Sequence, residues 1–200
     1  MVLINDWEGR SPEFLSNVFD GDAADIVKYI SDSSMSKIME IGFGNNRLLP
    51  KILGLGLNLS YFGLDKTQSF VSRAKTKFDL PKVSFYKLDI EDLNHLNAIV
   101  HNIKPDILIL RYILEHVPGW RESLQCINEL GIPSLLISLY TETKLEVSQS
   151  NTISTEVYEY TENSISGIEM SEILSNYKMA KLSEYDKVIH TLRIYEKTNV

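Results

Sequence analysis

The chain has 200 residues, of which 44% are hydrophobic and 24% charged, which is ordinary for a globular protein with a sizeable core. Its formal net charge of -7 does not indicate a basic surface, so neither nucleic acid nor a membrane is expected as a partner. The only cysteine, Cys126, excludes an internal disulfide, and with no recognisable signal peptide or membrane-length apolar run the cytoplasm is the expected compartment.

The first 35 residues predict helices ahead of the first strand. Helix start signals stand at Ser11-Pro12 and Asp20-Gly21-Asp22, and they predict helices over residues 11–19 and 22–30. We expect residues 1–35 to form an N-terminal helical lid. Trp7 and Phe14 would either belong to this lid or anchor its helices on the core.

Apolar strands and helical patterns alternate from residue 36 onward. Strands are expected at residues 36–41, 59–64, 83–88, 107–110 and 134–139, and helices at residues 47–55, 68–78, 93–102 and 120–130. Nearly continuous apolar strands separated by helices indicate a parallel sheet covered on both faces. Right-handed crossover connections follow from that arrangement.

The pattern changes after Leu139. Residues 140–167 are polar and lack clear periodicity, so we expect an irregular insertion on the substrate side, in which Tyr158 and Tyr160 are candidates to line an acceptor pocket. A helix is expected at residues 168–177, and strands at 181–188 and 191–196, whose very short link forces an antiparallel pair. Without internal repeats or a low-complexity linker, residues 1–200 are expected to form a single domain.

A glycine turn follows the first predicted strand. Glu40-Ile-Gly42-Phe-Gly44-Asn-Asn46 leads from a strand directly into a helical pattern. Glycines let a ligand approach the main chain without meeting a Cβ, and free N–H groups at a helix start suit a nucleotide-type cofactor. Asn46 tolerates a left-handed backbone better than most residues. Arg47 disfavours a dinucleotide-binding fingerprint, which needs a small residue there.

Taken together, these motifs resemble those of class I S-adenosylmethionine-dependent methyltransferases. The resemblance covers about residues 36–196 and is most specific over residues 40–117. The segment from Glu40 to Asn46 is similar to the family's acidic-x-Gly-x-Gly-x-Gly motif, and Gly-Leu-Asp65 and Leu88-Asp89-Ile90 are similar to its next two motifs. Residues 106–117, which contain Leu-Glu115-His116-Val, are similar to its fourth-strand segment.

The resemblance implies both a fold class and a cofactor. The fold is expected to be α/β, a three-layer Rossmann-like sandwich with a mostly parallel seven-stranded sheet and an antiparallel C-terminal strand. The cofactor is expected to be S-adenosylmethionine, with S-adenosylhomocysteine as the product. The residues implied to bind it are Glu40, Gly42, Gly44, Asn46, Asp65, Asp89, Ile90 and Arg111.

Chemistry supports the roles that the resemblance implies for the two aspartates. Vicinal ribose hydroxyls suit a carboxylate such as Asp65, which can accept two charge-assisted hydrogen bonds. The adenine amine is a donor and suits Asp89, while the backbone N–H of Ile90 can serve a ring nitrogen. The alternative is that Asp65 and Asp89 are helix N-caps, because a predicted helix follows each of them.

Residues just past the fourth predicted strand are candidates for the acceptor side. They are Arg111, Tyr112, Glu115 and His116. We expect His116 to be a catalytic general base, because histidine titrates near neutral pH, or else to orient the loop. Arg111, also expected to be catalytic, would bind a substrate carboxylate or phosphate, or else pair with Glu40 or Glu115.

The expected function is methyl transfer from S-adenosylmethionine to an oxygen, nitrogen or carbon atom of a small-molecule acceptor. No metal is expected, because the four histidines show no metal-ligand spacing. The sequence is compatible with a homodimer. Two alternatives stay open: a non-catalytic subunit that binds S-adenosylmethionine or activates a partner, and an NAD-dependent oxidoreductase.

Overall fold

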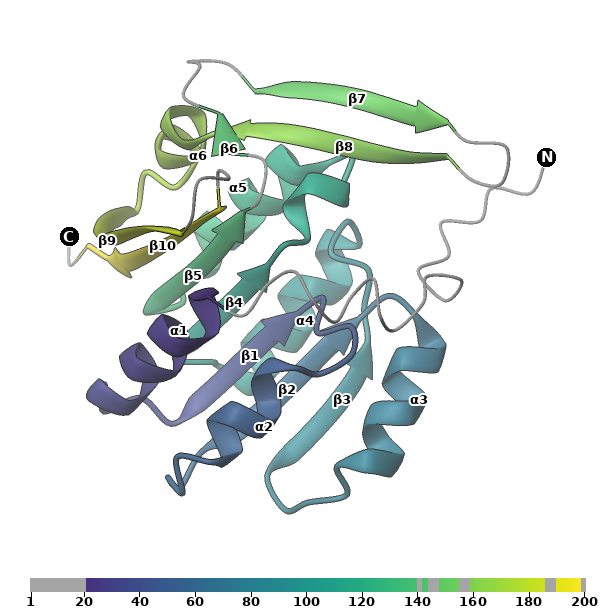
Figure 1. Cartoon of the computed structure of the whole chain (residues 1–200), viewed down its shortest axis with the longest axis vertical. Coiled ribbons are helices and arrows are strands. Elements are labelled where there is room, and N and C mark those ends of the chain that lie inside the picture. The colour runs from purple at the N-terminus through teal and green to yellow at the C-terminus, as the bar shows by residue number, and fades with distance from the viewer. Residues whose placement is uncertain (1–20, 140–141, 144–147, 155–158, 186–189, 199–200) are drawn as a thin grey trace.

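The computed structural model describes residues 21–139, 142–143, 148–154, 159–185 and 190–198, and Figure 1 shows their arrangement. The main sheet has seven strands: β1 (Lys37–Ile41), β2 (Ser60–Asp65), β3 (Val83–Lys87), β4 (Ile107–Arg111), β5 (Ser134–Leu139), β9 (Tyr177–Tyr185) and β10 (His190–Lys197). The helices are α1 (Gly21–Asp32), α2 (Leu48–Leu53), α3 (Gln68–Lys77), α4 (Leu93–Ile103), α5 (Trp120–Leu130) and α6 (Gly167–Ile173), with a short 3₁₀ turn, η2 (Leu114–His116), after β4.

The strand order confirms the predicted fold class. The sheet runs β3-β2-β1-β4-β5-β10-β9, and β1 to β5 pair in parallel with their neighbours. The strand β10 is antiparallel to both β5 and β9. The order reverses between β1 and β4, and in open α/β sheets ligands bind at the carboxyl ends of the strands beside such a reversal.

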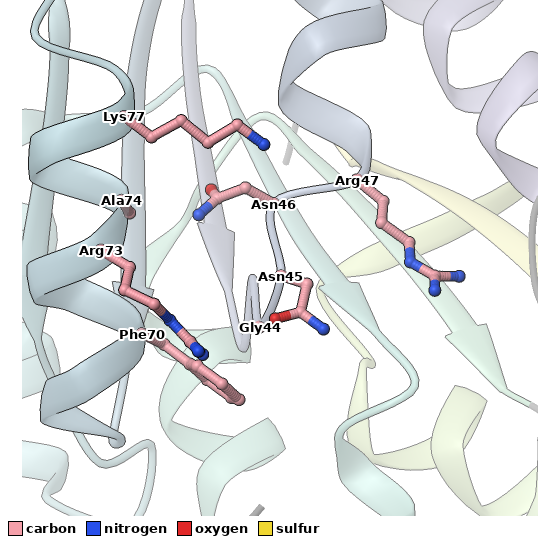
Figure 2. A pocket seen from close by; sticks show the side chains of 8 residues that line it. All are labelled: Gly44, Asn45, Asn46, Arg47, Phe70, Arg73, Ala74 and Lys77. Atoms are coloured by element: carbon pink, nitrogen blue, oxygen red, sulfur yellow. The ribbon is translucent and has the colours of Figure 1, made fainter. Parts of the chain in front are cut away.

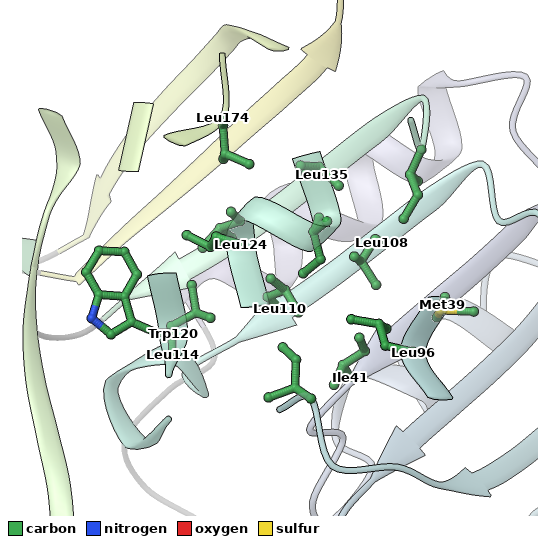
Figure 3. Packing of buried hydrophobic residues seen from close by; sticks show 14 of the residues in the cluster. Met39, Ile41, Leu96, Leu108, Leu110, Leu114, Trp120, Leu124, Leu135 and Leu174 are labelled. Carbon is green, nitrogen blue, oxygen red and sulfur yellow. The ribbon is translucent and has the colours of Figure 1, made fainter. Parts of the chain in front are cut away.

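Helices cover both faces of this sheet because alternate side chains of its buried strands point to opposite sides. Ile107 and Ile109 of β4 pack with α1, α2 and α3, whereas Leu108 and Leu110 pack with α4, α5 and α6. Figure 3 shows the second of these clusters, in which Leu96 and Leu124 meet Leu108 and Leu110. Each face therefore has a core of its own.

The predicted helix at residues 22–30 is present as α1. Its side chains Ala23, Ile26 and Ile30 are fully buried against the first face of the sheet. The helix predicted at residues 11–19, together with Trp7 and Phe14, lies outside the described residues. Only the second half of the expected N-terminal lid is therefore described.

The predicted irregular stretch contains strands, so that prediction was wrong. A second sheet of three strands has the order β6-β8-β7, formed by β6 (Glu142–Thr143), β7 (Gln149–Ser154) and β8 (Glu159–Ser166). Figure 1 shows β7 and β8 crossing the end of the main sheet where β4 and β5 finish. Apolar periodicity does not reveal these strands, because part of their contact with the rest of the protein is polar. Asn163 is fully buried and donates to the carbonyls of Leu114 and Val117 at 2.9 and 2.8 Å.

The C-terminal elements begin earlier than the sequence pattern indicated. The helix α6 ends at Ile173 instead of running to Tyr177, and β9 starts at Tyr177 instead of Lys181. Tertiary hydrogen bonds explain the change. The N–H of Asn176 donates to Asn128 Oδ1 at 3.0 Å, and the hydroxyl of Tyr177 donates to the carbonyl of Ile132 at 2.8 Å. The predicted antiparallel pairing of the last two strands is confirmed.

Asn163 provides a test of how the second sheet is attached. Replacing it with alanine removes the donors to two carbonyls next to η2, and leaving such buried groups unpaired costs about 1–3 kcal/mol. We expect Asn163→Ala to lower the free energy of unfolding by about that amount in chemical denaturation. The matched control is Ser164→Ala on the same strand, which should change it by less than about 0.5 kcal/mol. Equal effects of the two substitutions would contradict this attachment.

Candidate functional site

The glycine turn after β1 is built from left-handed residues. Gly42, Gly44 and Asn46 have φ angles of 77°, 50° and 56°, which glycine and asparagine adopt most readily. A Cβ at position 42 would lie 2.2 Å from the side chain of Ile113, whereas a Cβ at position 44 would meet nothing within 4 Å. Gly42 is therefore required by packing against the segment after β4, and Gly44 borders open space.

Asp65, the last residue of β2, holds this turn. Its Oδ2 accepts from the N–H of Gly44 and its Oδ1 accepts from the N–H of Thr67, each at 2.9 Å. Burial raises the pKa of Asp65 above its ordinary value of 3.8, although these two N–H groups act in the opposite direction. Thr67, not Asp65, is the N-cap of α3, so the N-cap alternative does not describe Asp65. The glycine turn and this carboxylate therefore lie side by side at the carboxyl ends of β1 and β2.

Aromatic packing against β3 supports the glycine turn. The Phe43 ring lies edge-on to the Phe85 ring of β3, with centroids 5.2 Å apart. The two rings fit because position 63, between them on β2, is glycine: a Cβ there would lie 2.9 Å from Phe43 and 2.7 Å from Phe85. No sequence motif marks Gly63, because its role depends on two rings that are distant in the sequence.

Glu40 is buried beside the turn at the end of β1. Only 3% of Glu40 is exposed, and its Oε2 accepts from the hydroxyl of Tyr61 at 2.5 Å. Burial raises the pKa of Glu40, while the hydrogen bond from Tyr61 and the charge of Arg111 lower it. Tyr61 is a partner that the sequence pattern did not reveal, because it reads there as an ordinary aromatic strand residue.

The end of β3 lies next to the end of β2. The N–H of Leu88 donates to the carbonyl of Asp65 at 3.0 Å, which brings Asp89 and Ile90 to the same edge of the sheet. Asp89 is exposed and its Oδ1 accepts from the N–H of Glu91 at 3.2 Å, while the side chain of Ile90 is buried in the core. The N-cap of α4 is Asp92, so the N-cap alternative does not describe Asp89 either.

Arg111 is held by a residue that the sequence did not predict. Its Nε and Nη2 donate to both carboxylate oxygens of Asp22 on α1, each at 2.9 Å, and the hydroxyl of Ser138 donates to the same carboxylate at 2.5 Å. Asp22 is fully buried. Asp22 was not among the expected structural partners, Glu40 and Glu115, and the charge of Glu40 also acts on Arg111. In the sequence, Asp22 indicates only a helix start, and its long separation from Arg111 hides the contact.

Tyr112 follows Arg111 in a left-handed conformation with a φ of 55°. Such a backbone is unfavourable for an aromatic residue and marks a constrained position. Its ring lies 6.1 Å from the His190 ring at the start of β10. Burial and the nearby Asp22 raise the pKa of Tyr112 far above its ordinary value of 10.0.

His116 lies in η2, directly after the fourth strand as predicted. It is half-buried, and its neighbour Glu115 is fully buried. The two carbonyls that accept from Asn163 belong to Leu114, the first residue of this turn, and to Val117, which follows it, so the second sheet is attached directly to the turn that carries His116. Of the predicted acceptor-pocket tyrosines, Tyr158 lies outside the described residues and Tyr160 lies in β8.

The side chain of Asn46 is directed toward α3. Figure 2 shows it extending from the turn toward α3, in a pocket that it shares with Phe70, Ala74 and Lys77. The backbone of Asn46 belongs to the same left-handed turn as Gly42 and Gly44, while its side chain meets α3.

Within the described part of the chain, no three His, Cys, Asp or Glu side chains are grouped so that they could hold a metal ion. A search of the same residues for a helix long and apolar enough to cross a membrane finds none.

Comparison with solved structures shows the same fold in many methyltransferases. A S-adenosylmethionine-dependent methyltransferase from Clostridium acetobutylicum matches with a TM-score of 0.68 at 10% identity, over 93% of this chain and 95% of that one. The 1,6-didemethyltoxoflavin-N1-methyltransferase of Burkholderia thailandensis, with 1,6-didemethyltoxoflavin and S-adenosylhomocysteine bound, matches with a TM-score of 0.69 at 12% identity, over 94% of this chain and 82% of that one.

A third similar structure is an S-adenosylmethionine-bound amino pentose methyltransferase from Micromonospora echinaspora. It matches with a TM-score of 0.65 at 11% identity, over 93% of this chain and 94% of that one. No family model and no curated protein matches the chain in sequence. The chain has the fold of the class I, Rossmann-like S-adenosylmethionine-dependent methyltransferases.

The buried pair of Asp22 and Arg111 can be tested by its effect on stability. Asp22→Ala leaves the Arg111 guanidinium buried without its carboxylate, so we expect the free energy of unfolding to fall by about 3–5 kcal/mol. The double substitution Asp22→Leu with Arg111→Met should cost less than Asp22→Ala alone, because it removes both charges. Chemical denaturation measures both effects.

The same helix offers a matched control. Asp32 pairs with Lys28 at 2.7 Å, but these side chains are 61% and 70% exposed. Asp32→Ala should therefore change the free energy of unfolding by less than about 1 kcal/mol. If Asp22→Ala costs no more than Asp32→Ala, the buried pair does not stabilise the fold.

Proposed function

We propose that this protein transfers a methyl group from S-adenosylmethionine to a small-molecule acceptor. The observation that carries the proposal is the hydrogen bond between Asp65 and the N–H of Gly44. It joins a carboxylate at the end of β2 to an open glycine turn after β1. The similarity of its fold to methyltransferases solved with this cofactor or its product supports the proposal.

The cofactor would lie along the carboxyl ends of β1, β2 and β3. Asp65 would accept from the ribose hydroxyls through its remaining lone pairs, and the open space at Gly44 would take the methionine moiety. Asp89 would accept from the adenine amine and the backbone of Ile90 would meet the ring. Asn46 would take part through its backbone.

Glu40, Gly42 and Arg111 would act around the cofactor. Gly42 shapes the turn, because any side chain there would displace Ile113. The buried carboxylate of Glu40, held by Tyr61, would attract the positively charged methionine end. Since Asp22 binds two nitrogens of Arg111, we assign that arginine mainly to positioning α1 against the end of β4.

Methyl transfer requires little covalent chemistry from the protein. The bond from sulfur to the methyl carbon breaks, a bond from the acceptor nucleophile to that carbon forms, and S-adenosylhomocysteine leaves with the electron pair. The protein must align the two reactants, and a base must remove a proton when the acceptor is a hydroxyl or an ammonium group. His116, fixed beside the end of β4, is the candidate base.

The acceptor proposed is a small molecule. The second sheet lies over the end of β4, where it would narrow access to the methyl group. Two proteins of similar structure are named for acting on small molecules, a toxoflavin precursor and an amino pentose. Screening metabolite pools for acceptor-dependent formation of S-adenosylhomocysteine would identify the chemical class of the acceptor.

Replacing Asp65 tests the cofactor assignment. Removing its charge-assisted hydrogen bonds to the ribose should weaken binding of S-adenosylmethionine by roughly 2–4 kcal/mol, as measured by titration calorimetry. Asp79→Ala is the control, because this exposed aspartate lies after α3 and away from the turn. Thermal unfolding must show that Asp65→Ala is folded. A folded variant with wild-type affinity would refute the cofactor assignment.

Replacing His116 tests the catalytic assignment. If His116 is the base, His116→Gln should lower kcat by about two to four orders of magnitude and abolish a pH dependence near neutrality, with little change in cofactor affinity. The exposed His101 of α4 supplies the control substitution His101→Gln. Full activity of His116→Gln would leave catalysis to alignment of the reactants alone.

A further inference from the structure

A pocket lies between the glycine turn and α3. It has a volume of about 390 Å³, within the range of small-molecule sites. Its walls are the turn itself and one side of α3; the lining residues are Gly44, Asn45, Asn46, Arg47, Phe70, Arg73, Ala74 and Lys77. Asp65, Asp89 and Arg111 are not among them, so the pocket adjoins the proposed cofactor site and shares Gly44 and Asn46 with it.

The lining of this pocket is strongly positive. Arg73 and Lys77 extend from α3 toward the turn in Figure 2, and Arg47 borders the pocket from the turn itself. No lining residue is acidic, although the whole chain has a net charge of -7. Elsewhere in the described residues, Arg111 and Arg121 are paired with Asp22 and Glu169. The described residues give Arg47, Arg73 and Lys77 no such carboxylate.

Asn46 gives an independent sign of a missing partner. Only 5% of Asn46 is exposed, and its Oδ1 makes no hydrogen bond with any described residue. A buried polar oxygen without a partner is costly, and such groups call for a specific explanation. Figure 2 shows this amide directed into the pocket beside Lys77. A ligand with a proton to donate would satisfy Oδ1.

We propose that this pocket binds a multiply charged phosphate group, either diphosphate or a phosphorylated small molecule. Guanidinium groups match the oxygens of phosphate, and the lysine adds a point charge. At neutral pH, phosphate oxygens are partly protonated, so the ligand supplies both the negative charge that Arg73 and Lys77 attract and the donor that Asn46 needs. The cation of Arg73 is already held over the Phe70 ring, 4.8 Å from its centroid.

Phosphate binding should also affect the cofactor site, and this step rests on the proposed function. Gly44 lines the pocket and donates to Asp65, so a ligand that orders the turn would stabilise the carboxylate that holds the ribose. Affinities linked in this way change reciprocally. Diphosphate should then tighten binding of S-adenosylmethionine, and S-adenosylmethionine should tighten binding of diphosphate by the same factor.

Calorimetric titration of the full chain with inorganic diphosphate tests the pocket directly. Arg73→Ala and Lys77→Ala should each weaken diphosphate binding about tenfold or more, because each removes a charge-assisted contact. Lys75→Ala removes the same charge from the same helix but outside the pocket, and should leave the affinity within about twofold. Sulfate should bind more weakly than hydrogen phosphate, because sulfate has no proton to donate to Asn46.

The outcomes separate this inference from the proposed function. Absence of saturable diphosphate binding, or equal losses with Lys75→Ala and Lys77→Ala, would overturn the phosphate site even if S-adenosylmethionine binds normally. Equal affinities for sulfate and hydrogen phosphate would overturn the role of Asn46. Normal diphosphate binding without any binding of S-adenosylmethionine would reject the proposed function and leave the phosphate site in place.

Discussion

The left-handed turn between β1 and α2 is the constraint on which both sites depend. Gly42, Gly44 and Asn46 turn the chain away from the sheet within five residues, and a carboxylate at the neighbouring strand end fixes that path through one N–H group. Because α2 has only six residues, its short length cannot hold the turn by itself. The position of the turn is therefore set from outside, by Asp65 of β2 and by Phe85 of β3, against which Phe43 of the turn packs.

The acceptor side is fixed by contacts of a different kind. On one face of the sheet, a buried carboxylate of α1 grips the last residue of β4. On the other side, a buried amide of β8 holds the carbonyls around η2. The short segment between these contacts contains Tyr112 and His116. Its left-handed backbone at Tyr112 is held in place by the structure around it.

The centre of the main sheet could be predicted from the sequence because β1, β4 and β5 are buried on both sides. Such strands are nearly continuous apolar runs. A glycine follows β1 and a polar residue ends β4, which marks the edge of the sheet. Asp65 and Gly44 could be brought together by this reasoning because both lie at carboxyl ends of adjacent parallel strands. The length of α6 and the start of β9 could not, because hydrogen bonds from Asn176 to Asn128 and from Tyr177 to Ile132 decide them.

The residues that sequence reasoning missed share one property: their partners lie far away along the chain. Asp22 and Arg111 are 89 positions apart, and Asn163 lies 49 positions from Leu114. Polar contacts of this kind leave no local periodicity. The direction of the Asn46 side chain was also beyond prediction, because the motif fixes the backbone at that position and says nothing about which helix the amide meets.

Gly63 shows that a residue needed only for packing can be as strictly required as a residue that contacts a ligand. It lies in the middle of β2, away from the open end of the sheet, and the two phenylalanine rings that close over it leave no room for a methyl group. A larger residue would lift Phe43 and with it the turn that this ring supports. In an alignment of relatives that keep both rings, position 63 should be as invariant as Gly44, although nothing that the protein binds would ever touch it.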